Sequence, residues 1–171
     1  PIAYVEEASW PGFLRRFIGQ WPTEEISVSQ AVKQRPITAD PTALRIAETR
    51  TVSAKSVFSF QPHGVAHSTF AGLPWLLRLK EQTGDSVHFW PFDGFGIPAG
   101  KSVVTEVYPS LFKRLFRAPS DLNEHQRDAW LVSRWLQDRD HTGLLSAYFS
   151  PPLTTSERDA VKLEGWILGV M

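Results

Sequence analysis

Apolar residues recur every three or four positions in several parts of the chain, which predicts helices. The predicted helices cover residues 6–20, 41–50, 73–80 and 109–116, a long segment from Ser120 or Asp121 to about Gln137, and a last segment after Thr154. Gly84 is typical of the residue that follows a helix end. Thr154 and Glu157 have the spacing of a capping box, in which each side chain bonds a free backbone N–H of the first turn.

Alternating or β-rich patterns predict strands at residues 56–60, 88–92 and 102–108. Residues 21–40 show no sustained period and predict a long loop, and residues 61–68 predict a connector. Strands that alternate with helices indicate an α/β fold, and no linker or repeat divides the chain, so we expect a single domain over residues 1–171.

Composition narrows the function classes. The 171 residues include no cysteine, which excludes disulfide scaffolds, thiolate zinc sites and cysteine nucleophiles. Eighteen basic residues balance eighteen acidic ones, so no global field favours nucleic acid or an anionic membrane. With no long apolar run and no secretory signal pattern, we expect a cytoplasmic location and no membrane partner. The chain starts at Pro1 rather than at Met, which is compatible with a sequence that begins inside a longer protein.

The strand predicted at residues 102–108 carries an acid on an apolar face. The period of two puts Glu106 beside Val104 and Tyr108, with Val103 and Val107 opposite. A carboxylate there either pairs with a basic residue or binds a metal ion, because an unpaired buried charge is unfavourable. Pairing is the favoured interpretation of this residue taken alone.

Asp128 gives a similar signal on the long helix, because it shares a stripe with Leu131, Val132 and Trp135. It is either an acid stabilised by the helix N-terminus or a second carboxylate that joins Glu106 in an oxygen site for Mg²⁺ or Mn²⁺. Two anomalous acids on adjoining elements leave both interpretations open.

Other chemistry has weaker support. His63 and His67 lie four residues apart, but in a predicted connector without an acid between them, so a histidine metal site ranks last. No Gly-x-Ser-x-Gly motif is present, and the glycines near Gly94 indicate a turn rather than a dinucleotide site. Lys113, Arg114 and Arg117 form a local basic cluster that is either a solvated helix face or a phosphate contact.

Several short stretches also carry a family resemblance. They are residues 54–58, 70–76, 88–94, 106–109, 128–130 with 135–136, 151–154 and 164–169. Together they resemble a bacterial family of unknown function whose members are described as predicted nucleases with an RNase H-like fold. The resemblance covers the chain from about residue 45 to the C-terminus.

The resemblance implies an RNase H-like mixed sheet flanked by helices, with one acid on an early strand, one on a later strand and one on a helix. Glu106 and Asp128 match the last two. The family's N-terminal strand and its acid have no match here, since Glu6 and Glu7 precede a helix pattern. We therefore expect either a sequence that begins inside a longer protein or a member that has lost this acid and with it one metal position. In such folds two divalent ions about 4 Å apart activate water and stabilise the leaving oxygen in phosphodiester hydrolysis.

Further residues have roles that the resemblance implies. Asp93 is a candidate auxiliary metal ligand, although an acid that starts a turn before Gly94 explains it more simply. Lys55 is a candidate phosphate contact, or alternatively pairs with an acid. Lys113 and Arg114 are also candidate phosphate contacts.

Two hypotheses follow. The first is a Mg²⁺- or Mn²⁺-dependent phosphodiester hydrolase acting on nucleic acid or a small phosphoester, with Glu106 and Asp128 as catalytic metal ligands. The second is a non-catalytic domain of the same fold that binds a partner. Carboxylates that converge in an open cleft favour the first, and carboxylates that each contact their own Arg or Lys favour the second. The sequence leaves the oligomeric state open.

Overall fold

The computed structural model describes residues 9–35, 43–51, 54–62 and 64–171, and these form a mixed α/β structure rich in helix. The elements in chain order are α1 (Trp10–Gln20), α2 (Val28–Gln34), α3 (Ile46–Thr49), α4 (Ala66–Thr83), η2 (Gly84–Ser86), β1 (Val87–Phe89), β2 (Ser102–Val104), β3 (Glu106–Val107), η3 (Pro109–Phe112), α5 (Glu124–His141), α6 (Leu145–Tyr148), α7 (Thr155–Glu164) and β4 (Ile167–Leu168). None of the helices described is long and apolar enough to cross a membrane.

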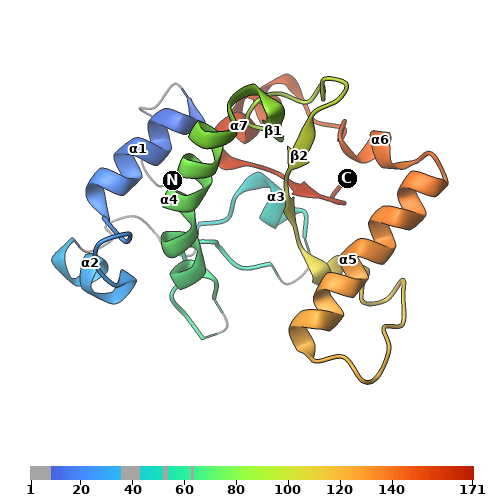
Figure 1. Ribbon diagram of the computed structural model, residues 1–171, viewed down its shortest axis with the longest axis horizontal. Helices are drawn as coiled ribbons and strands as arrows, with labels where there is room; N and C mark the ends of the chain where they lie inside the picture. Colours follow the sequence, from blue (N-terminus) through green and yellow to red (C-terminus); the bar gives the residue numbers. More distant parts are fainter. Residues whose placement is uncertain (1–8, 36–42, 52–53, 63) are drawn as a thin grey trace.

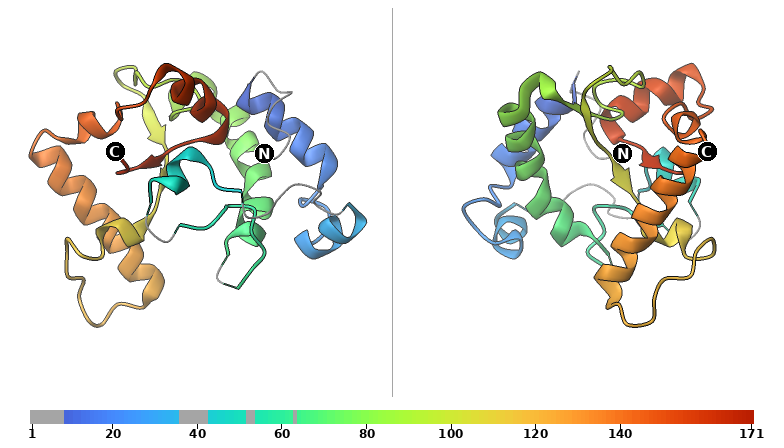
Figure 2. Two further views of the ribbon diagram at one scale, coloured as in Figure 1. Left: turned by 180° about the vertical axis from the view of Figure 1, so that it is seen from behind. Right: turned by 45° about the vertical axis from the view of Figure 1, so that its right-hand side comes forward.

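The strands are short and pair in parallel. β1 pairs with β2 in the register Val87 to Ser102, and β3 pairs with β4 in the register Glu106 to Ile167. The strand predicted at residues 102–108 is therefore divided at Thr105 into β2 and β3. α1, α2 and α4 lie on one side of β2, while α5 and α6 lie on the other (Figures 1 and 2).

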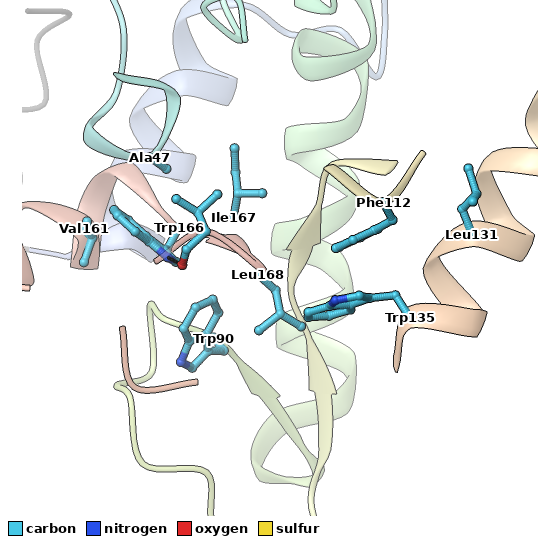
Figure 3. Close-up of a cluster of buried hydrophobic side chains, with 10 residues drawn as sticks. Ala47, Trp90, Phe112, Leu131, Trp135, Val161, Trp166, Ile167 and Leu168 are labelled. Atoms are coloured by element: carbon cyan, nitrogen blue, oxygen red, sulfur yellow. Dashed lines mark hydrogen bonds between the residues drawn. The ribbon is translucent and has the colours of Figure 1, made fainter. Parts of the chain in front are cut away.

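The structure has two hydrophobic cores, one on each side of β2. The first core lies between α1, α4 and β1, where Phe17 meets Phe70 edge to face at 4.9 Å between ring centroids. The second core joins α5, α7, β4 and η3, and in it Phe112 stacks on Trp135 at 4.4 Å (Figure 3). Val103 packs against the second core and Val104 against the first, which confirms the predicted alternation within β2. Val107 and Tyr108, predicted on opposite faces, both pack against the second core, because the strand is divided at Thr105 and ends at Val107.

Local sequence chemistry fixes several helix ends as predicted. Thr154 and Glu157 form the predicted capping box of α7, in which the Glu157 carboxylate accepts from the Thr154 backbone N–H at 2.8 Å. α4 ends at Thr83, and Gly84 follows with a φ of 50°, a conformation that favours glycine.

The loop predicted at residues 21–40 is wrong over its middle part, where α2 forms. Ser27 and Gln30 build a capping box at its start, and Val28, Ala31 and Val32 follow at helical spacing and contact the first core or are buried. The Ser-x-x-Gln spacing and this repeat were the signals available in the sequence, but the repeat covers less than two turns.

The strand predicted at residues 56–60 is also wrong. The backbone folds into turns instead, with the Ser59 N–H donating to the Ser56 carbonyl at 3.0 Å and the Val57 N–H donating to the Glu48 carboxylate at 3.2 Å. These bonds replace a β-ladder, because no neighbouring strand lies beside this segment in the part of the chain that the structure describes.

Other boundaries shift. α4 begins at Ala66, so the connector predicted at residues 61–68 is shorter, and α5 is capped by Asn123 rather than by Ser120 or Asp121. The Asn123 side chain forms a capping box with Gln126, the third residue of α5. Asn123 rather than Ser120 or Asp121 is therefore the N-cap residue. The strand predicted at residues 88–92 ends at Phe89, and the helix predicted at residues 109–116 is a 3₁₀ turn that ends at Phe112. Residues 1–8, 36–42, 52–53 and 63 lie outside the described residues, and with them Glu6, Glu7 and His63.

Candidate functional site

Glu106, the central acid of the sequence interpretation, lies against a guanidinium. Arg45 donates from Nη1 to Glu106 Oε2 and from Nη2 to Glu106 Oε1, both at 2.8 Å. This two-bond geometry is the strong form of a carboxylate pair with arginine. The side chain of Arg45 is 10% exposed and that of Glu106 is 41% exposed. The pair therefore lies at the boundary between the interior and solvent.

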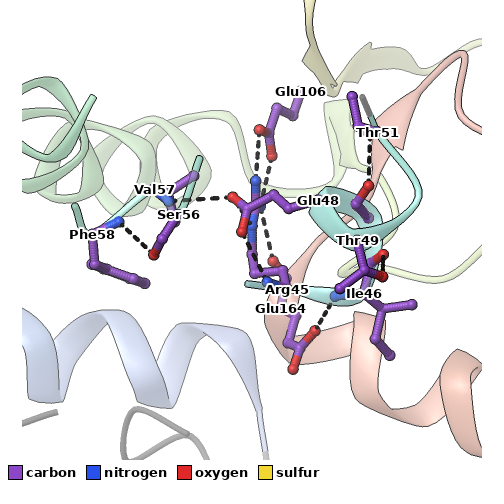
Figure 4. Close-up of polar contacts among 11 residues, drawn as sticks. Arg45, Ile46, Glu48, Thr49, Thr51, Ser56, Val57, Phe58, Glu106 and Glu164 are labelled. Atoms are coloured by element: carbon purple, nitrogen blue, oxygen red, sulfur yellow. Dashed lines mark hydrogen bonds and ion pairs between the residues drawn. The ribbon is translucent and has the colours of Figure 1, made fainter. Parts of the chain in front are cut away.

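Two further acids surround Arg45. Its Nε donates to Glu48 Oε1 at 3.0 Å, and its Nη1 also donates to the backbone carbonyl of Glu164 at 3.1 Å. The Glu164 carboxylate accepts from the backbone N–H of Ile46 at 3.0 Å. We refer to Arg45, Glu48, Glu106 and Glu164 as the Arg45 cluster (Figure 4).

The buried positive charge of Arg45 is stabilised by the acids that contact it. Burial by itself lowers the pKa of Arg45, but the hydrogen bond and charge of Glu106, followed by those of Glu48, outweigh it and raise that pKa. Glu48 is 2% exposed and also accepts from the Arg45 backbone N–H at 2.8 Å. Arg45 thus remains charged and acts as the internal counter-ion of these acids.

A cleft of about 460 Å³ opens beside the Arg45 cluster. Its walls are mainly aromatic and aliphatic and come from α1, α4, β1, the turn after β1 and β2. They include Trp10, Phe13, Leu73, Leu76, Phe89 and Phe92. Trp10 and Phe92 stack at 4.0 Å between ring centroids. Arg45, Glu106 and Glu164 also line it. We call it the apolar cleft.

A second cavity of about 500 Å³ is also lined by the Arg45–Glu106 pair. It shares Arg45, Glu106, Val57 and Val65 with the apolar cleft, and it is also lined by Lys55. The Lys55 ammonium donates to the carbonyl of Pro62 at 2.8 Å.

Asp128 contacts a different cation. Its Oδ1 lies 3.7 Å from Lys113 Nζ, and both side chains are partly exposed, so this is a loose surface pair. Leu131 and Trp135 of the predicted stripe are buried in the second core. Asp128 lines neither of the two cavities. Glu106 and Asp128 therefore each contact their own basic residue.

The Asp93 carboxylate also bonds groups of the chain itself. It accepts from Lys80 Nζ at 2.6 Å and from the Phe89 backbone N–H at 2.9 Å, and these bonds stabilise the turn after β1.

The remaining candidate residues do not converge on a common site. Arg114 and Arg117 are exposed beside Lys113. His67 packs edge to face on Phe60 at 4.9 Å. Among the described residues, no three His, Asp or Glu side chains are grouped as a metal site would require.

Sequence reasoning missed three members of the Arg45 cluster. Arg45 and Glu48 have the spacing of an i,i+3 helix pair, which is a weak local signal. Nothing in the sequence connects either of them to Glu106, which is 61 positions from Arg45, or to Glu164. Comparisons with protein-family models, with curated proteins and with solved structures found no match to this chain.

Proposed function

We propose that this chain is a non-catalytic binding domain and that the apolar cleft is its binding site for a small, mainly apolar ligand. The observation that carries the proposal is the Arg45–Glu106 pair. Both oxygens of the acid that would be the main metal ligand already accept hydrogen bonds from a cation of the chain itself.

The energetics of this pair favour binding over metal chemistry. A divalent ion on Glu106 would compete with Arg45, whose side chain is only 10% exposed. Separating the pair would leave the buried guanidinium without one of its two carboxylate partners, which is unfavourable because burial penalises a charge that loses compensation. The pair therefore acts as a wall of the cleft rather than as an open ligand set.

The cleft has the properties of a small-molecule site. Pockets that hold such ligands commonly enclose about 300–1,000 Å³, and their walls are mostly apolar with a few polar groups that fix orientation. The apolar cleft, at about 460 Å³, has aromatic walls and polar groups from the Arg45 cluster and from Ser68 and Thr69.

A matched pair of glycine variants tests this proposal. Gly72 lines the cleft on α4 and Gly19 lies on α1 away from it, and a Cβ added at either position meets no atom within 4 Å. Each change to Leu also favours the helix by roughly 0.5–1 kcal/mol, so both variants should fold. We expect the uncharged dye Nile red to bind the wild type and Gly19→Leu, and to lose its binding in Gly72→Leu. Equal dye binding by all three proteins, or by none, would refute the cleft as a binding site.

The second candidate function is phosphodiester hydrolysis with Mg²⁺ or Mn²⁺ on nucleic acid or a small phosphoester. The resemblance to predicted RNase H-like nucleases suggests it. The observation that favours it is solvent access, since the Glu106 and Asp128 side chains are 41% and 33% exposed and the Asp128 pair is loose. Bound ions would activate water and stabilise the leaving oxygen, with Lys55, Lys113 and Arg114 near phosphate.

Isothermal titration separates the two candidates. Mg²⁺ and Mn²⁺ are titrated into the wild type and into the variant Glu106→Gln with Asp128→Asn. The binding-domain proposal expects no ion uptake that depends on these two acids. Ion binding that disappears in the double variant, together with Mn²⁺-dependent cleavage of DNA or RNA, would establish the hydrolase instead.

A further inference from the structure

The charge at the polar end of the apolar cleft is negative although an arginine is present. The Arg45 cluster combines one guanidinium with the three carboxylates of Glu48, Glu106 and Glu164, so its formal charge is −2. Among the residues that the structure describes, the charged ones that line the cleft are Arg45, Glu106 and Glu164. Lys55, the other basic residue described in the adjoining cavity, donates to a backbone carbonyl at 2.8 Å.

Arg45 has little capacity left for an anionic ligand. A guanidinium carries five N–H donors. Four of the hydrogen bonds that Arg45 donates go to Glu48, to both oxygens of Glu106 and to the carbonyl of Glu164. A carboxylate or phosphate in the cleft would therefore meet two acids without a free guanidinium edge.

The acids retain capacity to accept. An ionised carboxylate offers about four lone-pair positions. Glu106 uses two of them on Arg45 and is still 41% exposed, and Glu164 accepts from Ile46 through Oε2. A donor group that enters the cleft can thus bond the Glu106 carboxylate without displacing Arg45.

We propose that the apolar cleft selects a small organic amine, whose ammonium binds Glu106, with the negative charge of Glu164 adding to the attraction, and whose apolar or aromatic body packs on Trp10, Phe13 and Phe92. This inference rests on the proposed binding function. It assigns the sign of the ligand's charge, because complementary charges attract strongly in a partly desolvated site and like charges are rejected. The body of the ligand contributes through the apolar area that it removes from water.

A matched series of ligands tests the charge selection. 4-Phenylbutylamine, 4-phenylbutanol and 4-phenylbutanoate share one apolar body and differ in the charge of the head group. Each competes with Nile red for the cleft. We expect the amine to bind roughly tenfold more tightly than the alcohol, since hydrogen bonds between charged groups contribute about that much, and the carboxylate to bind most weakly. The preference for the amine should decrease as salt is added.

Two variants of α7 locate the selecting charge. Glu164→Gln removes one negative charge while its amide oxygen can still accept from Ile46. Asp159→Asn makes the same charge change on the same helix, at a side chain that is 68% exposed and outside the cleft. We expect Glu164→Gln to reduce the advantage of the amine over the alcohol several-fold, and Asp159→Asn to leave it unchanged.

The possible outcomes separate the two proposals. If Nile red binds in the cleft but the amine binds no better than the alcohol, or the carboxylate binds best, the charge selection is refuted and the binding function stands. If Gly72→Leu and the wild type bind Nile red equally, the binding function itself fails. Equal loss of amine preference in Glu164→Gln and Asp159→Asn would indicate a general charge effect and would also refute the selection.

Discussion

Replacing Arg45 by Met would test whether the Arg45 cluster depends on this single cation. The change removes the charged partner of Glu48, which is 2% exposed, and of Glu106, which is 41% exposed. Met fills much of the same volume, so the main effect is electrostatic rather than a cavity. The chain is expected to fold but with lower stability.

The magnitude follows from the burial of the two acids. Breaking a buried pair by removal of one partner costs about 3–5 kcal/mol. Water can solvate Glu106 once Arg45 is gone, so only Glu48 is left strongly uncompensated. We therefore expect the lower end of that range, a loss of about 3 kcal/mol in the free energy of unfolding.

Urea unfolding provides the assay. With a slope of about 2 kcal/mol per M, the midpoint should fall by about 1.5 M. Adding Glu48→Gln to Arg45→Met removes the uncompensated charge and should restore about half of the loss or more. The control is Arg15→Met, because the Arg15–Glu81 pair is 62% and 55% exposed and should change stability by less than about 0.5 kcal/mol. A loss below about 1 kcal/mol in Arg45→Met, or no recovery in the double variant, would refute the reasoning.

Four other substitutions have expected outcomes. Gly64→Ala places a Cβ 2.2 Å from a backbone carbonyl oxygen and should destabilise by about 2 kcal/mol or more, whereas Gly72→Ala has free space and should stabilise; equal midpoints in urea would contradict this. Asn123→Ala removes the cap of α5 and should cost about 1 kcal/mol in thermal or urea unfolding, and an unchanged stability would show that this cap contributes nothing. The pKa of Glu157 is lowered by the backbone N–H of Thr154, then by its hydroxyl, so its stabilisation is present above the ordinary pKa of about 4.3 and is lost as the pH falls through the lower folded-state value. The stability difference between wild type and Glu157→Gln should therefore disappear in acid, and a difference independent of pH would contradict the assignment.

The sequence by itself determined the features that depend on neighbours within one helical turn or one strand. The capping box at Thr154 follows from side chains that satisfy backbone groups three residues away. The end of α4 before Gly84 follows from a backbone conformation with positive φ that favours glycine. The alternation of Val103 and Val104 follows from the period of a strand. Such interactions need no knowledge of the rest of the fold.

Only the tertiary structure decided which distant groups meet. The alternating segment at residues 56–60 is not a strand, because a strand requires a neighbouring strand as partner. The backbone N–H groups of this segment instead form hydrogen bonds within turns and to the Glu48 carboxylate. The sequence indicated that Glu106 needs either a metal ion or a basic residue, but it could not identify Arg45, which is 61 positions away. A buried charge is stabilised by whatever lies next to it in space, and that neighbour is set by how helices and strands pack rather than by spacing along the chain.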